Sequence, residues 1–334
     1  MSVKKLSLGV LLAVVLSYPV ASGKKQRKAW ADSGSVTAVL WRSPTDMASR
    51  DLFWGSGGRQ DQPHGPFTFV KEDLDGTSPK FVVRDRDGVK WKVKLGLEAR
   101  PETVAARIVW AAGYYTGEDY FVPDLQVQGM PVRLHRGYKL VAPDGSVPNV
   151  RLKREWTEEK KIGNWHWRDN LFTGTRELNG LKVMMALINN WDLKDENNAI
   201  YQKGSERIYM VSDLGASFGS AGRSWPRDRA KGNLDSYHQS MFLRQVTDGW
   251  IDFRVPARPR YVYLVNPKEY IRRVGLERIG RQVPRADARW MGELLAHLST
   301  RQIRDAFRAA GYSPQEVEGF AAVFENRIAI LTDL

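Results

Sequence analysis

The stretch Asn-Asn-Trp-Asp-Leu-Lys-Asp-Glu-Asn-Asn at residues 189–198, followed by Val-Ser-Asp-Leu-Gly at 211–215, is the most informative part of this sequence. It contains Asp192, a lysine two residues later and an asparagine five residues later, and a second carboxylate, Asp213, begins the Asp-Leu-Gly triplet. Carboxylate and amide oxygens are the ligands that hard cations prefer, whereas a lysine ammonium binds anions. The two segments therefore predict a site that holds a metal ion beside an anionic group.

Phosphoryl transfer is the chemistry that needs these four groups on one wall of a cleft. We expect Asp192 to orient the attacking hydroxyl and Lys194 to lie against the transferring phosphate. Asn197 and Asp213 are the expected Mg²⁺ ligands. The preceding residues 179–189 are apolar nearly all round, which predicts a buried helix that carries this polar loop into the interior. Polar groups are costly there unless ligands or other groups satisfy them.

Length, charge and cysteine content limit the classes of protein to consider. The chain has 334 residues, 42% hydrophobic and 27% charged, which predicts one large or two modest globular domains. The net charge is +13, but six positive charges precede residue 30, so the remainder is only mildly basic. This charge suits an anionic substrate such as a nucleotide and is too small to indicate nucleic acid. The absence of cysteine excludes a disulfide framework, and five scattered histidines argue against a transition-metal enzyme.

The N-terminal segment has the form of an export signal. Lys4 and Lys5 precede an apolar run from Leu6 to Val20 and a small-residue site at 21–23. We therefore predict an exported protein, periplasmic or extracellular, with residues 1–23 either cleaved or kept as a membrane anchor. No other membrane span is predicted. Residues 24–65, with a Gly-Ser-Gly-Gly cluster that lacks strand–loop–helix surroundings, are interpreted as a linker or a covering arm.

Residues 66–155 have the pattern of an antiparallel sheet of five to six strands. Strands are expected near 67–71, 80–84, 89–96, 120–122, 132–134, 138–141 and 150–152, with an Asp-Gly turn before residue 89. The loop from Asp75 to Lys80 is small, hydroxylated and ends in a lysine. Gly76 and Lys80 are therefore candidates for contact with nucleotide phosphates, although an ordinary hairpin loop explains the pattern equally well.

One lysine of the third strand is a candidate partner of the nucleotide. Lys90, Lys92 and Lys94 share a strand face, which in itself is typical of a solvated surface. Pro101 fits the start of a helix to about residue 112 with a glutamate early in it, and a strand lysine paired with such a glutamate positions a nucleotide. We select Lys94 and Glu102; Lys92 and Glu98 remain the alternatives.

Residues 156–334 are expected to be mainly helical. Trp156, Trp165 and Trp167 mark the junction, where they could stack an adenine or, more commonly, form a core seam. Residues 216–232 are rich in Gly, Ser and Arg and suit an activation or substrate loop. Helix starts are predicted at Ser299 and Ser313, because each is followed three residues later by Gln or Glu.

Taken together, the sequence resembles the protein-kinase-like superfamily, nearer to its divergent branches (HipA-type bacterial kinases, phosphoinositide kinases and secretory-pathway kinases) than to ordinary eukaryotic protein kinases. The resemblance spans roughly Phe67 to Gly215 and is sharpest in Asp-Leu-Lys-Asp-Glu-Asn (192–197) and Asp-Leu-Gly (213–215). The sequence is also similar to an uncharacterised bacterial group that shares Gly-Thr-Arg-Glu-Leu-Asn-Gly (174–180) and the Asn-Asn-Trp-Asp-Leu-Lys run.

The resemblance implies an α+β, two-lobed protein-kinase-like fold with an antiparallel N-lobe carrying one helix and a mostly helical C-lobe. It implies ATP and Mg²⁺ as cofactors, with Lys94 on the α- and β-phosphates and held by Glu102. The sequence departs from the ordinary kinase pattern in three places. Asn190-Trp191 replaces the His-Arg before the catalytic Asp, no Gly-x-Gly-x-x-Gly-x-Val loop precedes the lysine strand, and no Ala-Pro-Glu follows the Asp-Leu-Gly.

The leading hypothesis is an ATP- and Mg²⁺-dependent phosphotransferase with a protein, a lipid headgroup or a small molecule as acceptor. A nucleotidyl transferase that moves AMP could use the same metal ligands. A catalytically inactive, kinase-shaped binding module of the cell envelope is the alternative from another class, although such a module needs none of Asp192, Asn197 and Asp213. A Ca²⁺ loop is disfavoured because Lys194 interrupts the alternating oxygen ligands of an EF-hand.

Overall fold

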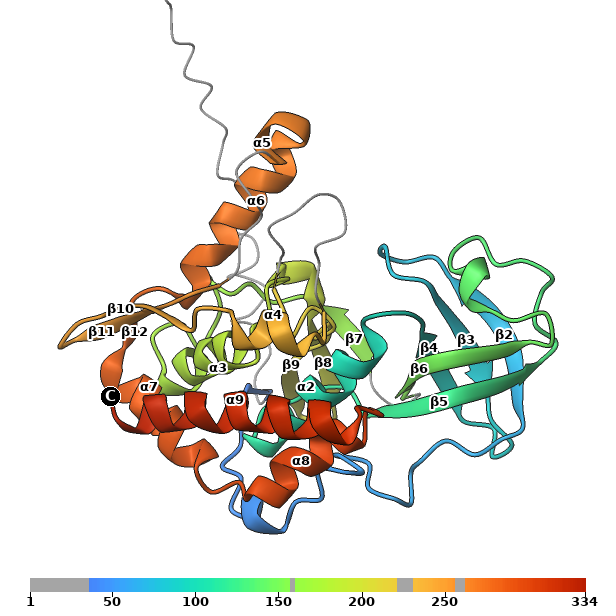
Figure 1. The fold of residues 1–334 in the computed structure, drawn as a ribbon, viewed down its shortest axis with the longest axis horizontal. Helices are drawn as coiled ribbons and strands as arrows, with labels where there is room; N and C mark the ends of the chain where they lie inside the picture. Colours follow the sequence, from blue (N-terminus) through green and yellow to red (C-terminus); the bar gives the residue numbers. More distant parts are fainter. Residues whose placement is uncertain (1–35, 157–159, 221–230, 256–261) are drawn as a thin grey trace, which may run out of the picture. The chain divides into compact units, whose positions relative to one another are not determined.

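Five strands between residues 67 and 154 form a closed barrel in the computed structural model, which describes residues 36–156, 160–220, 231–255 and 262–334 (Figure 1). The strands are β2 (Phe67–Asp73), β3 (Lys80–Arg84), β4 (Lys90–Lys94), β5 (Asp119–Gln128) and β6 (Ser146–Arg154), in the spatial order β2-β3-β4-β6-β5. Neighbouring strands are antiparallel, as predicted. The exception is a short parallel pairing of β2 with β5, which closes the barrel.

The turn between β3 and β4 follows the predicted Asp-Gly chemistry. Asp85 Oδ1 accepts hydrogen bonds from the backbone N–H groups of Asp87 and Val89, at 3.0 and 2.8 Å. Gly88 has a φ of +82°, a conformation that residues with a side chain rarely adopt. Inward-facing residues of the strands form the barrel core, among them Phe81, Val83, Trp91, Val93 and Leu152. Their alternation with polar residues fixes which face of each strand is buried.

The prediction of strands at 132–134 and 138–141 is wrong. Residues 129–145 form a loop with one 3₁₀ turn, η2 (Tyr138–Leu140). Gly129 and Gly137 both have positive φ, and such residues interrupt an extended strand. The loop is held instead by Glu72, whose carboxylate accepts the backbone N–H groups of His135 and Arg136 at 2.9 and 2.8 Å.

Helix α2 (Ala99–Ala111) follows β4 and contacts both the barrel strands β5 and β6 and helix α8 (Thr300–Arg308). Contact on two sides explains why eleven of its thirteen residues are buried. The helix begins two residues before Pro101, so the predicted start was late. A proline fits within the first turn because its missing N–H would have no helical partner there.

The remainder of the chain combines helices with two small sheets, so the fold is α+β (Figure 1). The helices are α3 (Arg176–Leu187), α4 (Leu234–His238), α5 (Val262–Val265), α6 (Pro267–Glu277), α7 (Arg285–Leu295), α8 and α9 (Pro314–Thr332), with 3₁₀ turns η1 (Met47–Ser49), η3 (Asp195–Asn197) and η4 (Arg278–Gly280). One sheet has the order β1 (Thr37–Val39), β9 (Glu206–Val211), β8 (Asn198–Lys203), β7 (Lys160–Gly163). The other contains β10 (Leu243–Val246), β11 (Trp250–Phe253) and β12 (Val283–Pro284).

Aromatic residues dominate the core of the helical part. Phe307 on α8 stacks on Phe320 on α9, with ring centroids 5.0 Å apart, and Phe218 packs edge-on against both. The two predicted helix starts are confirmed, because Ser299 and Ser313 each form a capping box with the side chain three residues later. The backbone N–H of Phe218 donates to the Ile188 carbonyl at 2.8 Å, which joins this core to the residue before the polar loop at 189–198.

Residues 37–64 cover other elements and are not a free linker. Strand β1 pairs with β9 in parallel, and Trp41 Nε1 donates to the carbonyl oxygen of Ala112 at 2.7 Å. The Gln302 side chain on α8 donates to the carbonyls of Met47 and Arg50, both at 2.9 Å. The predicted export signal at 1–23 lies outside the described residues, and so do 221–230 of the predicted substrate loop.

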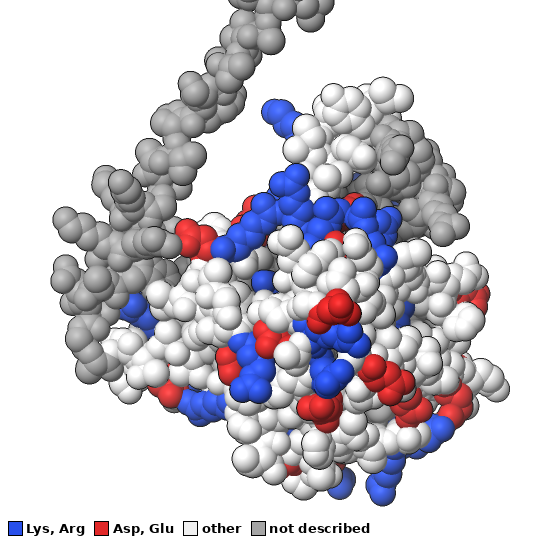
Figure 2. Space-filling view, turned by 90° about the vertical axis from the view of Figure 1, so that its left-hand side faces the viewer, with Lys and Arg blue, Asp and Glu red and all other residues white. Residues whose placement is uncertain are grey.

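The surface has both signs of charge. On the face shown in Figure 2, Lys and Arg side chains gather in a band across the upper part, and Asp and Glu are scattered among basic residues below it. Within the described residues, no helix combines the length and the apolar character needed to cross a bilayer.

Candidate active site around Lys94

The three lysines of β4 differ in their surroundings along the strand. Lys90 is exposed, and Lys92 is half-buried and forms an ion pair with Asp73 at 2.8 Å. Only 4% of the Lys94 side chain is exposed to solvent. Lys94 Nζ contacts three carboxylates: Glu102 Oε2 at 2.7 Å, Asp213 Oδ1 at 2.9 Å and Glu98 Oε2 at 3.0 Å. The structure therefore brings together the strand lysine, both candidate glutamates and the Asp of Asp-Leu-Gly.

Glu102 is held from two adjacent strands. Its other oxygen, Oε1, accepts from Arg151 Nη2 at 2.8 Å, and Arg151 on β6 is the cross-strand neighbour of Lys94 on β4. Arg151 also lies 3.8 Å from Asp119 Oδ1 on β5. All four side chains are buried. Lys94 and Arg151, on neighbouring strands, thus hold α2 against the barrel through Glu102. The sequence pattern did not reveal Arg151, because its position beside Lys94 depends on the register of β4 and β6.

The electrostatics of the cluster favour a charged lysine. Burial by itself lowers the pKa of Lys94, but the carboxylates of Glu102, Asp213 and Glu98 outweigh it and hold that pKa well above its usual range. Burial raises the pKa of Asp213, yet the neighbouring Lys94 ammonium reverses this and leaves the pKa of Asp213 lowered. These surroundings favour the charged form of Lys94, which is the form that binds an anion.

Three backbone features hold the polar loop before Asp192 in place. Asn189, two residues after the end of α3, lies in the left-handed region at φ +54°, where asparagine is tolerated better than most residues. The Asn190 side-chain oxygen accepts the backbone N–H of Asp192 at 3.0 Å, and the N–H of the buried Trp191 donates to the Ala216 carbonyl at 3.3 Å. The hydrogen bonds of Asn190 and Trp191 thus stabilise the loop at the position where the ordinary kinase pattern has His-Arg.

Asp192, Lys194 and Asn197 lie together in this loop. Lys194 Nζ bonds Asp192 Oδ2 at 2.9 Å, and both side chains are half-buried. Asn197 Nδ2 donates to the Asp192 carbonyl at 2.7 Å, and the Asn197 carbonyl accepts from the backbone N–H of Ser212 at 2.9 Å. Asn197 therefore adjoins the residue that precedes Asp213. Asp195, in the same loop, instead binds the His166 ring at 2.8 Å and the Trp167 N–H at 3.0 Å, which ties the loop to its neighbours.

Asp213 and Asn197 supply oxygen atoms near the end of β9, the donor type that Mg²⁺ prefers. Asp213 keeps 39% of its side chain exposed, and Asn197 donates its amide nitrogen to the Asp192 carbonyl. Binding of Mg²⁺ by these two residues stays a prediction. The ligand atoms of Glu98, Glu102 and Asp213 also lie within 4.8 Å of one another. Lys94 contacts all three of those carboxylates, so this second grouping is an ammonium site rather than a metal site.

Glu98, which precedes α2, joins three further segments. Oε2 accepts from the Ser78 hydroxyl at 2.9 Å in addition to Lys94, and Oε1 is bonded to Lys231 Nζ. Gly215, the last residue of the Asp-Leu-Gly, packs directly on the Glu98 side chain. Glu98 was the rejected alternative to Glu102 in the sequence, and Ser78 and Lys231 carried no signal because their proximity arises only from folding.

Gly215→Ala is expected to lower the free energy of unfolding by about 1–3 kcal/mol, as overpacking of a tight contact does. The new methyl carbon would lie 2.7 Å from Glu98 Cβ, a separation that requires the backbone of one segment to shift. Urea denaturation measures the change. Gly249→Ala is the matched control, since no atom lies within 4 Å of the added carbon there. Equal stability of the two variants would contradict this packing.

The loop from residue 74 to Lys80 approaches the same face of the barrel. Lys80 is the cross-strand neighbour of Lys94, lies 3.9 Å from Asp73 Oδ2, and has a pKa lowered chiefly by burial. Gly76 has φ +67°, and its carbonyl accepts from the Arg136 guanidinium. Arg136 thus attaches this loop to the 129–145 loop. Contact of Gly76 or Lys80 with a phosphate stays a prediction.

The other sequence-derived candidates have structural roles. Trp165 and Trp167 are buried against each other, with ring centroids 4.8 Å apart, and Trp165 Nε1 donates to the Met210 carbonyl at 3.0 Å. Trp156 is exposed, and the Arg154 guanidinium lies over its ring. Trp165 and Trp167 therefore form a core seam of which Trp156 is not a part.

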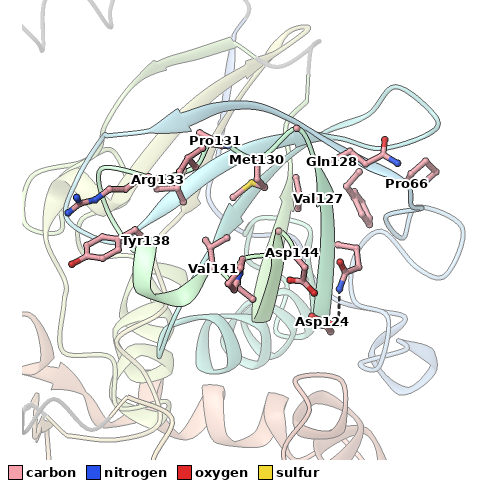
Figure 3. Close-up of a pocket in the computed structure, with 18 of the residues that line it drawn as sticks. Pro66, Asp124, Val127, Gln128, Met130, Pro131, Arg133, Tyr138, Val141 and Asp144 are labelled. Atoms are coloured by element: carbon pink, nitrogen blue, oxygen red, sulfur yellow. Dashed lines mark hydrogen bonds between the residues drawn. The ribbon is translucent and has the colours of Figure 1, made fainter.

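A cavity of about 1070 Å³ lies at the β5–β6 end of the barrel (Figure 3). It is bounded by the 129–145 loop, with Met130, Tyr138 and Val141 on one side and Val127 on β5. None of Lys94, Asp192, Asn197 and Asp213 lines it. It is therefore separate from the candidate active site.

Comparison with known proteins finds distant likenesses among solved structures. No protein-family model matches the chain, and no curated protein matches it. Among solved structures, the chain is similar to the Helicobacter pylori proinflammatory kinase CtkA, with a TM-score of 0.45 and 10% sequence identity, over 80% of this chain and 96% of that chain.

Proposed function

We propose that this chain is a kinase-like phosphotransferase that uses ATP and Mg²⁺. The observation that carries the proposal is the contact of Lys94 Nζ with Glu102 at 2.7 Å and with Asp213 at 2.9 Å. Lys94 lies on a barrel strand and Glu102 on the helix that follows it, and Asp213 of the Asp-Leu-Gly comes more than a hundred residues later in the chain. A strand lysine paired to a helix glutamate and facing a metal-binding Asp is the arrangement on which kinases depend.

In this proposal, the barrel with α2 forms the nucleotide lobe, and the helical part with the loop at 189–198 forms the catalytic lobe. Lys94 would bind the nucleotide phosphates, and Glu102, fixed by Arg151, would hold the lysine in position. Positioning and charge neutralisation are most of what this reaction requires from a protein.

Asn197 and Asp213 would hold Mg²⁺, which would neutralise negative charge on the nucleotide phosphates. Asp192 would accept a hydrogen bond from the acceptor hydroxyl and take up its proton as the phosphoryl group leaves ATP for that oxygen. Lys194, bonded to Asp192 at 2.9 Å, would lie beside the transferring group. The acceptor class, whether protein, lipid headgroup or small molecule, is not part of the proposal.

Binding of MgATP tests the proposal. We expect MgATP at saturating concentration to raise the Tm of the full chain by several degrees, because a ligand that binds only the folded state stabilises it. The shift should require Mg²⁺ and should disappear in Asp213→Ala. Asp248→Ala, which removes an exposed carboxylate in the turn between β10 and β11, is the matched control and should keep the shift.

A well-folded wild-type chain that shows no Mg²⁺-dependent shift with any nucleotide would overturn the proposal. That result would leave a kinase-shaped binding module as the better explanation.

A further inference from the structure

Glu98 is held like a bound anion. Its two oxygens accept hydrogen bonds from three donors on separate segments: Lys94 on β4, Ser78 in the loop before β3, and Lys231 in the segment after the Asp-Leu-Gly. Two ammonium groups and a hydroxyl around one carboxylate are the donors that a phosphate group also takes. Glu98 immediately precedes α2, yet its side chain makes no capping bond with that helix.

Carboxylates surround the Lys94 ammonium while Glu98 is in place. Lys94 Nζ donates hydrogen bonds to Glu98 and Asp213 and lies 2.7 Å from Glu102 Oε2, so three carboxylates occupy the space around its three N–H donors. A nucleotide phosphate can bind Lys94 only if one carboxylate leaves. Asp213 leaving alone would free one donor, but it would also keep the negative charge of Glu98 against the incoming phosphate.

Glu98 is the carboxylate that can move. Glu102 is fully buried, and Arg151 holds its second oxygen at 2.8 Å. Glu98 is partly exposed at the start of the helix. Gly215 packs on Cβ and Cγ of Glu98 as well as on Oε2, so rotation of the carboxylate away from Lys94 would give up the Oε2 contact and keep the contact with Cβ.

We infer that Glu98 occupies the place of a nucleotide phosphate group, and that Lys231 is a phosphate-binding residue released to the nucleotide when Glu98 swings away. The inference rests on the proposed function and adds two roles to it. Glu98 competes with the nucleotide, and Lys231 supplies a second cation from the segment that follows Asp213. Lys231 Nζ also lies 5.6 Å from the centre of the Trp191 ring, which keeps it close to the loop that carries Asp192.

Equilibrium binding of MgATP to the full-length wild type, Glu98→Gln and Lys231→Met tests the inference. We expect Glu98→Gln to lower the Kd about tenfold, since charge-assisted hydrogen bonds no longer need to be broken. Lys231→Met should raise the Kd about tenfold through loss of one such bond to the phosphate. Glu98→Ala serves as a second variant, and the Tm of each protein without ligand reports whether it is folded.

Matched controls separate this effect from a general change in charge. Glu206→Gln removes a carboxylate from β9 and Lys90→Met removes an exposed lysine from β4, and neither should change the Kd for MgATP. Adenosine, which has no phosphate, should bind all the variants equally. An equal change in the Kd for adenosine and for MgATP would overturn the inference.

The outcomes distinguish this inference from the proposed function. Asp213-dependent MgATP binding whose Kd is the same in wild type, Glu98→Gln and Lys231→Met would overturn the inference and leave the proposed function standing. Absence of MgATP binding in wild type and in both Glu98 variants would overturn both.

Discussion

Replacing Lys94 with methionine is expected to lower the free energy of unfolding by about 3–5 kcal/mol, the usual cost of removing one partner from a buried ion pair. Methionine fills a similar volume, so the loss is electrostatic rather than a cavity effect. Glu98, Glu102 and Asp213 would then converge within 4.8 Å without the ammonium that now contacts all three. Arg151 would still pair with Glu102 and Lys231 with Glu98, so Asp213 would lose its ion-pair partner while the other two carboxylates would each keep one cation.

Urea denaturation of the wild type, Lys94→Met, Lys90→Met, Glu98→Gln and the double variant Lys94→Met/Glu98→Gln measures this effect. Lys90→Met is the control on the same face of the same strand, and its exposed side chain should change stability by less than about 0.5 kcal/mol. Adding Glu98→Gln to Lys94→Met removes one of the three neighbouring negative charges and should recover part of the loss, a coupling that a double-mutant cycle reports. Equal stability of Lys94→Met and Lys90→Met would show that the carboxylates do not depend on Lys94.

Local patterns in the sequence predicted much of the barrel and of the helical part. The alternating residues of β2 to β4 and the Asp-Gly turn depend on neighbours in the chain, and the structure has them where they were expected. The capping boxes at Ser299 and Ser313 depend on residues three apart. The expected strands at 132–134 and 138–141 failed because Glu72, sixty residues earlier, holds that loop in another conformation.

The site residues that the sequence did not predict all join the site through contacts between segments distant in sequence. Lys94 and Asp213 were selected from motifs, and their direct contact is consistent with that choice. Arg151 joins the cluster because it faces Lys94 across β4 and β6, a register that no local pattern specifies. Lys231 and Ser78 reach Glu98 from segments 133 and 20 residues away. The sequence motifs therefore identified Lys94 and Asp213 at the centre of the cluster, but they did not identify the side chains around it.

Asp192→Asn is expected to slow phosphoryl transfer by a factor of roughly 10²–10⁴, the contribution typical of a positioned acid–base group. The amide keeps the shape of the carboxylate but cannot accept a proton, and it loses the charge that pairs with Lys194 at 2.9 Å. Asp192 has no role in holding the nucleotide in our proposal, so the Kd for MgATP should change by less than about threefold. Release or transfer of radiolabelled γ-phosphate, as autophosphorylation or slow hydrolysis, measures the rate.

Asp195→Asn is the matched control because it makes the same change three residues further along the same loop. Asp195 binds the Trp167 N–H and the His166 ring, contacts that attach the loop to its surroundings and that an amide oxygen can still accept in part. We expect Asp195→Asn to lower the Tm slightly and to keep the rate within about tenfold of wild type, since it leaves the proton acceptor in place. If both variants lost the rate equally, the loss would come from the shape of the loop and not from the chemistry of Asp192. A rate unchanged in Asp192→Asn would remove this residue from the mechanism, because nothing in the amide replaces a proton acceptor at that position.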